Sequence, residues 1–196
     1  MKQETLNRPA RGMILMKRSG RAFVAISAMT AIAFAAGTNA WAAAQQSAPS
    51  AAAVFEGEAN KLGASRCASL FSGLGNGLTA GSAFAVKTEV GAQPADAHAM
   101  QGVVGMTYNT PGFKGQAAGI IFAAPTGGAC EGNLVRVAPY RQSCREVVGL
   151  LPAGTTAGDT LSGVPTYNLG GNQGLALLLP SGSSCVVVSV ARSVAL

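Results

Sequence analysis

From Gly81 onward the sequence is a succession of short apolar segments separated by turn residues, and this pattern restricts the possible folds more than any other feature. In residues 82–90 apolar side chains such as Phe84 and Val86 alternate with Lys87 and Glu89, as in a strand with one buried face. Short turns rich in Gly, Pro, Asn and Asp favour antiparallel neighbours. The expected strands are 82–90, 101–108, 116–123, 133–138, 164–169, 175–179 and 185–190. The unbroken apolar run 175–179 predicts a strand buried on both faces.

A helical pattern precedes the strands. From Val54 to Leu74 the apolar residues fall on one broad side of a helical wheel, although Gly63 and Arg66 interrupt it. The glycine-rich run 73–77 predicts the C-terminal cap of this helix. The sequence thus predicts one long N-terminal helix.

Residues 140–151 fit two structures. Ser143 and Glu146 form a capping-box pattern that favours a short helix, whereas Val147 to Leu151 would also suit a strand. Residues 153–163 are expected to form a polar loop. The fold class that follows is α+β, with the N-terminal helix packed on an antiparallel sheet of about five to seven strands; an all-β sandwich or barrel is the alternative.

The first 42 residues have the parts of a secretory signal peptide. A basic segment at 17–21 precedes the apolar stretch 22–36, and Ala40, Trp41 and Ala42 form a small-x-small cleavage signal. An uncleaved anchor is the alternative. Residues 43–53, rich in Ala, Ser and Pro, are expected to be a flexible tether before a single domain at 54–196.

Removal of this leader changes the charge. It holds six of the 14 Lys and Arg residues and one of the eight Asp and Glu residues, so the remaining chain carries eight basic against seven acidic side chains. The formal net charge of +6 therefore belongs mostly to the leader. A balanced mature chain argues against a nucleic-acid partner.

Four cysteines remain in the mature chain: Cys67, Cys130, Cys144 and Cys185. An even number in an exported chain predicts two disulfides rather than a zinc site, because the spacing lacks the close pairs of structural zinc sites. Of the three possible pairings, we expect Cys130 with Cys144 and Cys67 with Cys185.

No motif for catalysis or cofactor binding is recognisable, so we expect no catalytic, cofactor-binding or metal-binding residues and no cofactor. The only histidine, His98, lies in a polar turn beside Asp96. A glycine pattern starting at Gly75 follows a helix, whereas a dinucleotide-binding fingerprint follows a strand. A glycosidase-like pair would have to come from seven scattered acids: Glu56, Glu58, Glu89, Asp96, Glu131, Glu146 and Asp159.

One cluster could contact a ligand or partner: Arg136, Tyr140, Arg141 and Arg145. If 140–151 is a helix, Arg141 and Arg145 share a face beside Tyr140, a combination suited to a carboxylate, a sulfate or an acidic protein surface. The alternative is a solvated rim in which Arg145 pairs with Glu146 or Glu131.

These observations predict a periplasmic or secreted, non-enzymatic binding or accessory protein of the cell envelope, with another envelope or secreted protein as its partner and no transmembrane span after cleavage. A small periplasmic hydrolase and a structural subunit of a surface assembly are the alternatives. In the last case the Ala-rich helix from Val54 would be the docking element.

Overall fold

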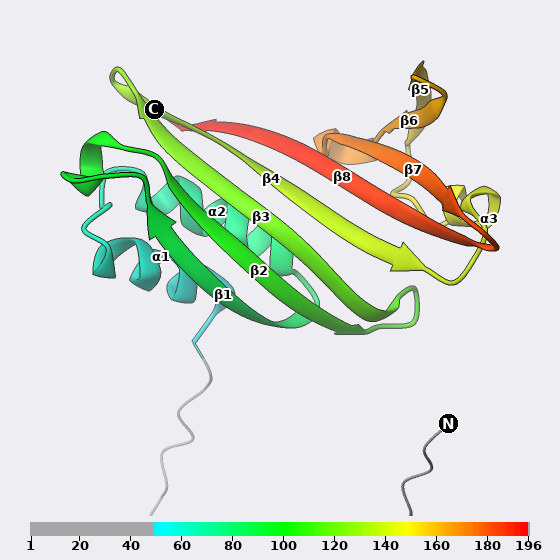
Figure 1. The fold of residues 1–196 in the computed structure, drawn as a ribbon, viewed down its shortest axis with the longest axis horizontal. Helices are drawn as coiled ribbons and strands as arrows, with labels where there is room; N and C mark the ends of the chain where they lie inside the picture. Colours follow the sequence, from blue (N-terminus) through cyan, green and yellow to red (C-terminus); the bar gives the residue numbers. More distant parts are fainter. Residues whose placement is uncertain (1–48, 196) are drawn as a thin grey trace, which may run out of the picture. The chain divides into compact units, whose positions relative to one another are not determined.

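A computed structural model of the chain describes residues 49–195. The expected signal peptide, and the tether up to residue 48, lie outside the described residues. The domain is one open antiparallel sheet with three α-helices (Figure 1), which fits the expected α+β class, but the sheet has eight strands rather than five to seven. Within residues 49–195 no helix has the length and apolar character needed to cross a membrane.

The strands form two meanders that share one sheet. Its order is β1-β2-β3-β4-β8-β7-β6-β5, so the last strand of the chain pairs with β4 and joins the two halves. The strands are β1 (Ser82–Val90), β2 (Met100–Asn109), β3 (Lys114–Thr126), β4 (Ala129–Tyr140), β5 (Thr156–Leu161), β6 (Val164–Asn168), β7 (Leu175–Ser181) and β8 (Ser184–Ala195).

All seven expected strands are present, and the eighth is β5, in the segment expected to be a loop. Each of its six residues is exposed. Because no face of β5 is buried, its sequence carries no alternation of apolar and polar side chains that would mark it as a strand.

The expected single N-terminal helix is wrong: it is two helices, α1 (Ala51–Lys61) and α2 (Ala68–Thr79). The chain reverses at Gly63, which has a left-handed φ of 74°. The turn lets Phe55 of α1 pack against Phe71 of α2, with ring centroids 5.9 Å apart. Helix α1 begins within the range expected to be a tether, with the Ser50 side chain as its N-cap.

The glycine run 73–77 does not end α2 but lies inside it. A Cβ at Gly75 would lie 2.2 Å from Phe55 Cδ2, so only glycine permits this approach of the two helices. The same applies on the sheet, where a Cβ at Gly119 or Gly132 would lie 2.7 Å from a side-chain carbon of Leu78 or Leu74. The main core therefore forms where α2 lies directly on glycines of the central strands.

A smaller core lies under α3 (Cys144–Val148), where Val147 packs against Leu178 and Cys185. The predicted capping box is confirmed: Ser143 Oγ accepts from the Glu146 N–H, and Glu146 Oε2 accepts from the Ser143 N–H at 2.8 Å. The helix is shorter than the range 140–151, since Tyr140 still belongs to β4.

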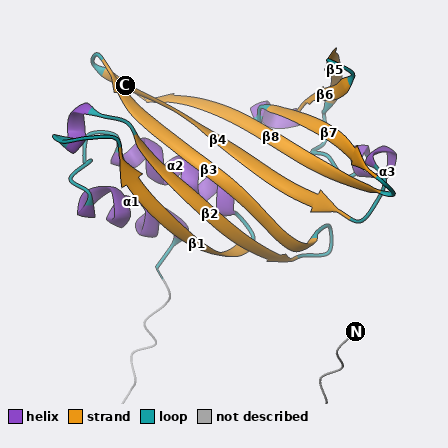
Figure 2. Cartoon of the chain, viewed as in Figure 1, coloured by secondary structure: helices purple, strands orange, loops and turns teal. Residues whose placement is uncertain are grey.

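All three helices cover the same face of the sheet (Figure 2). Side chains alternate along β8: its buried residues Cys185, Val187 and Ser189 have odd numbers, and the partly buried Ala195, which packs against the main core, continues the same face. The opposite face carries exposed apolar side chains such as Val103 and Ile120, which are 48% and 46% exposed. The expectation that 175–179 is buried on both faces is therefore wrong: Ala176 and Leu178 are buried and their neighbours are not.

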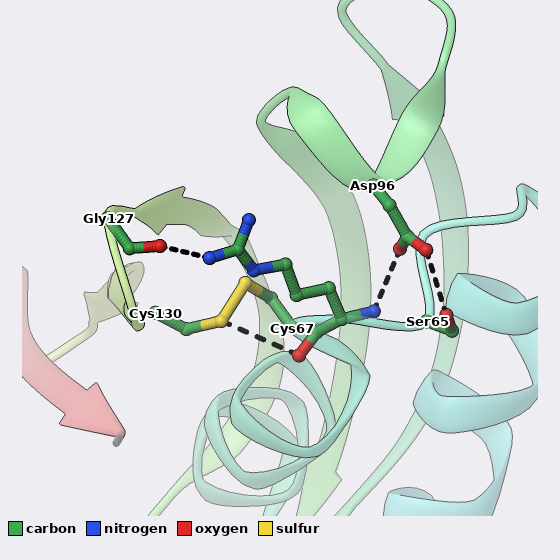
Figure 3. Close-up of a disulfide and its surroundings, with 6 residues drawn as sticks. Ser65, Cys67, Asp96, Gly127 and Cys130 are labelled. Carbon is green, nitrogen blue, oxygen red and sulfur yellow. Dashed lines mark hydrogen bonds between the residues drawn. A yellow bond between two sulfur atoms is a disulfide. The ribbon is translucent and has the colours of Figure 1, made fainter.

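The two predicted disulfides are present, but their expected pairing is wrong. Cys67 at the start of α2 bonds to Cys130 of β4, and Cys144 of α3 bonds to Cys185 of β8. Each bond fastens a helix to the sheet face that it covers, an arrangement that depends on the order of the strands. Figure 3 shows the first bond beside Asp96, which accepts hydrogen bonds from the Arg66 N–H (2.8 Å) and the Ser65 hydroxyl (3.0 Å).

Candidate functional site

The predicted ligand cluster is only partly assembled. Arg136 and Tyr140 lie four residues apart on β4, on its helix-covered face. Arg141 lies in the bend after β4, before α3 begins, and Arg145 lies on α3 itself. The shared helical face expected for Arg141 and Arg145 is therefore wrong, because the helix begins at Cys144.

Arg136 and Tyr140 line a hollow of about 290 Å³, which we call the Arg136 hollow. It lies between Ala80, just after α2, and Leu150, just after α3, where neither helix covers the end of the sheet. Its lining is Ala80, Tyr108, Thr110, Gly112, Phe113, Arg136, Ala138, Tyr140 and Leu150.

Three aromatic rings line the Arg136 hollow. The Phe113 ring lies 5.3 Å from that of Tyr108, edge to face, and 4.7 Å from that of Tyr140. Tyr108 is buried, and its hydroxyl donates to the Leu78 carbonyl oxygen at 3.2 Å. These contacts hold the rings in place, so the hollow has a rigid apolar wall next to one guanidinium group.

The Tyr140 hydroxyl is the polar group of this wall. Burial raises its pKa, and the nearby positive charge of Arg136 opposes this effect in part. The phenol therefore stays protonated at neutral pH. Among the described residues no hydrogen bond to this hydroxyl is formed, so it can donate to a ligand that Arg136 also contacts.

A second hollow, of about 430 Å³, lies on the other side of the β2–β3 turn; we call it the Arg141 hollow. It shares Gly112 and Phe113 with the first. Its charged side chains are Lys114 and Arg141, and its full lining is Pro111, Gly112, Phe113, Lys114, Pro139, Arg141 and Gln142.

Both hollows are positively charged. Of the described residues that line them, three are basic and none is acidic. The ion pairs within residues 49–195 are elsewhere, between Lys61 and Glu58 and between Arg192 and Glu131. The suggested pairing of Arg145 with Glu131 or Glu146 is therefore not formed: Glu131 binds Arg192 at 2.7 Å.

The other residues considered for chemistry lie apart from the hollows. His98 is exposed directly after a short 3-10 helix, η1 (Ala95–Ala97), and every cysteine is in a disulfide. The Glu146 carboxyl accepts two hydrogen bonds from Ser143, which lower its pKa, and it therefore caps α3. Within residues 49–195 no three His, Cys, Asp or Glu side chains gather closely enough to hold a metal ion.

Sequence reasoning missed Tyr108, Phe113 and Lys114. All three flank the turn at residues 109–112, which was correctly predicted to separate two strands. Two aromatic residues on either side of one short turn were the available signal, since a hairpin brings its two ends together.

These features describe a disulfide-bonded α+β domain with a basic, aromatic-lined site at one end of its sheet. No family model, curated protein or solved structure matches the chain. The functional argument therefore depends on the geometry of this site and on the sequence.

Proposed function

We propose that the protein is an exported, non-enzymatic binding protein of the cell envelope that recognises an acidic ligand or an acidic segment of another protein at the two hollows. The observation that supports this most directly is the combination of Arg136, Lys114 and Arg141 with an aromatic wall and without an acidic lining residue. Guanidinium groups bind carboxylates and sulfates in a fixed geometry, and aromatic side chains contact the apolar part of such ligands.

Export is supported by the signal-peptide pattern at 17–42 and by the two disulfides, which persist in oxidising compartments. Cell fractionation with N-terminal sequencing tests this part of the proposal. We expect a product that begins at Ala43 outside the cytoplasm. A full-length chain with reduced cysteines in the cytoplasm would contradict it.

The binding part can be tested with two charge reversals of equal size. Arg141→Glu changes the charge of a hollow, whereas Arg145→Glu changes an exposed residue of α3 that lines neither hollow. On a column of immobilised polyglutamate, we expect Arg141→Glu to elute at clearly lower salt than Arg145→Glu. Equal elution of the two variants would show that only net charge matters, and the proposal would then fail.

Arg136 and Tyr140 need milder changes because both are partly buried. We expect Arg136→Gln to weaken retention without lowering the thermal midpoint, and Tyr140→Phe to weaken it slightly, since only one hydroxyl donor is lost. A structural subunit of a surface assembly is the second candidate function. The apolar sheet face that the helices leave uncovered favours it.

A further inference from the structure

The proposed site does not explain the face of the sheet opposite the helices, which we call the open face. No element within residues 49–195 covers it, and the side chains that point outward from the central strands are mostly β-branched or small. The strand register aligns them in rows that cross five strands, from β2 to β7. One row is Val103, Ile120, Val135, Val190 and Leu175, and the next is Gly105, Ala118, Val137, Val188 and Leu177.

The two rows differ in height on β2 and β3. Val103 and Ile120 are 48% and 46% exposed, so they stand out from the sheet. In the next row Gly105 and Ala118 leave a shallow hollow of about 520 Å³ that Val137 borders. The open face therefore carries a ridge beside a hollow of similar chemistry, which is what a surface needs if it is to pack against a copy of itself.

The area is sufficient for a stable dimer. The five strands β2, β3, β4, β8 and β7 have 7 to 13 residues each and 54 in all. At about 3.3 Å per residue and about 4.8 Å between strands, their open face measures about 850 Å² per copy. A typical stable interface buries about 800 Å² per partner.

The charges of the open face also suit a second copy, because they lie at its margins and nearly balance. Lys87 and Glu89 are on the edge strand β1, and Lys114 is at the start of β3. Glu131 and Arg192, near the ends of β4 and β8, neutralise each other at 2.7 Å. The apolar rows between them contain no charged side chain, so two copies would bury no unpaired charge.

We propose that the open face packs against the open face of a second copy, with the two sheets about 10 Å apart and the ridge of each in the hollow of the other. The apolar rows contain none of the residues that give the two hollows their charge, and only Lys114 lies both in the Arg141 hollow and at the margin of the open face. The proposal therefore does not depend on the proposed ligand. The resulting homodimer has four layers, with the two sheets in the middle and the helices of each copy outside. The hollows stay at the end of each sheet.

The test is sedimentation of the protein purified from a host that expresses and exports the full chain. We expect a dimer in the micromolar range. Ile120→Lys and Val103→Lys each place a charge in the ridge and should raise the dimer dissociation constant at least tenfold. Leu161→Lys is the matched control, because Leu161 is 54% exposed but lies on β5, outside the rows. Its dissociation constant should equal that of the wild type.

Circular dichroism and thermal midpoints of the same samples separate loss of the interface from loss of the fold. Lysine at an exposed strand position leaves the core intact, so the ridge variants should be folded monomers. A wild-type protein that is monomeric at 100 µM would overturn the proposal. If that monomer binds phosphatidylcholine vesicles, the open face contacts lipid rather than a second copy, and the proposal fails as well. A dimer that survives both ridge variants would overturn it as well.

Discussion

Replacement of Gly75 by alanine is the sharpest test of how the helices pack. The new Cβ would lie 2.2 to 2.6 Å from three ring atoms of Phe55, and one of these is Cγ, so rotation of the ring cannot relieve the contact. Phe55 is fully buried between Phe71 and Phe84, whose ring centroids are 5.9 and 5.4 Å away. The ring or the whole of α1 must therefore move.

The expected free-energy change follows from two opposing effects. Alanine is favoured over glycine inside a helix by about 1 kcal/mol. Overpacking of a filled core costs about 1–3 kcal/mol, and the fully buried ring places Gly75→Ala near the upper limit. We expect a net loss of about 2 kcal/mol in the free energy of unfolding, which for a domain of this size lowers the thermal midpoint by about 4–8 °C.

Gly73→Ala is the matched control in the same helix. A Cβ at Gly73 meets no atom within 4 Å, so only the gain in helix propensity remains, and the thermal midpoint should rise by about 2–4 °C. Urea unfolding monitored by circular dichroism measures both variants. If Gly75→Ala were as stable as Gly73→Ala, the close packing of α1 on α2 would be refuted. Phe55→Leu in the Gly75→Ala background should cost less than the sum of the single changes.

Three further predictions concern the disulfides, Asp96 and the cap of α3. Non-reducing peptide mapping should recover Cys67 linked to Cys130 and Cys144 linked to Cys185. Removal of the first bond, which joins residues 63 positions apart, should cost about 4 kcal/mol in the chain-entropy model. Hydrogen bonds from the Arg66 N–H and the Ser65 hydroxyl hold the pKa of the Asp96 carboxyl below its unfolded value of about 3.9. The ionised carboxylate therefore stabilises the fold above about pH 4, and this contribution is lost as the pH falls through the lowered pKa. Urea unfolding should therefore find Asp96→Asn less stable than the wild type at pH 7, with a difference that shrinks below pH 4; a difference that stays constant would contradict this. Ser143→Ala should cost about 1 kcal/mol and speed amide hydrogen exchange in α3, whereas exchange in α2 should not change.

The sequence predicted the strands that bury one face, but it did not predict β5, which buries neither face. In β1 the side chains from Phe84 to Val90 alternate between core and solvent as their sequence indicates. Strand β5 has no buried residue, so its backbone pairing with β6 leaves no trace in its composition. The break between α1 and α2 was hidden for a different reason: the apolar positions of both helices continue one helical pattern, and only the left-handed Gly63 marks the turn.

Long-range properties were beyond the sequence. The expected pairing of Cys130 with Cys144 relied on their short separation, whereas the real partners depend on which helix covers which end of the sheet. The candidate site was half found. Arg136 and Tyr140 share a face because four residues also preserve the face of a strand, but Arg145 was assigned to the site through a helix that begins later.

The wrong expectation for residues 175–179 bears directly on the proposed dimer. Runs such as Leu175 to Leu179 and Val186 to Val188 are typical of strands covered on both faces, yet the helices cover only one. The outward residues of these runs do not contribute to the main core, and polar side chains there would serve an isolated domain equally well. An open apolar sheet face also promotes association, which is the role that we propose for these residues. A second copy with the same strands would supply the missing cover, and the apolar runs would then have the burial that their sequence indicates.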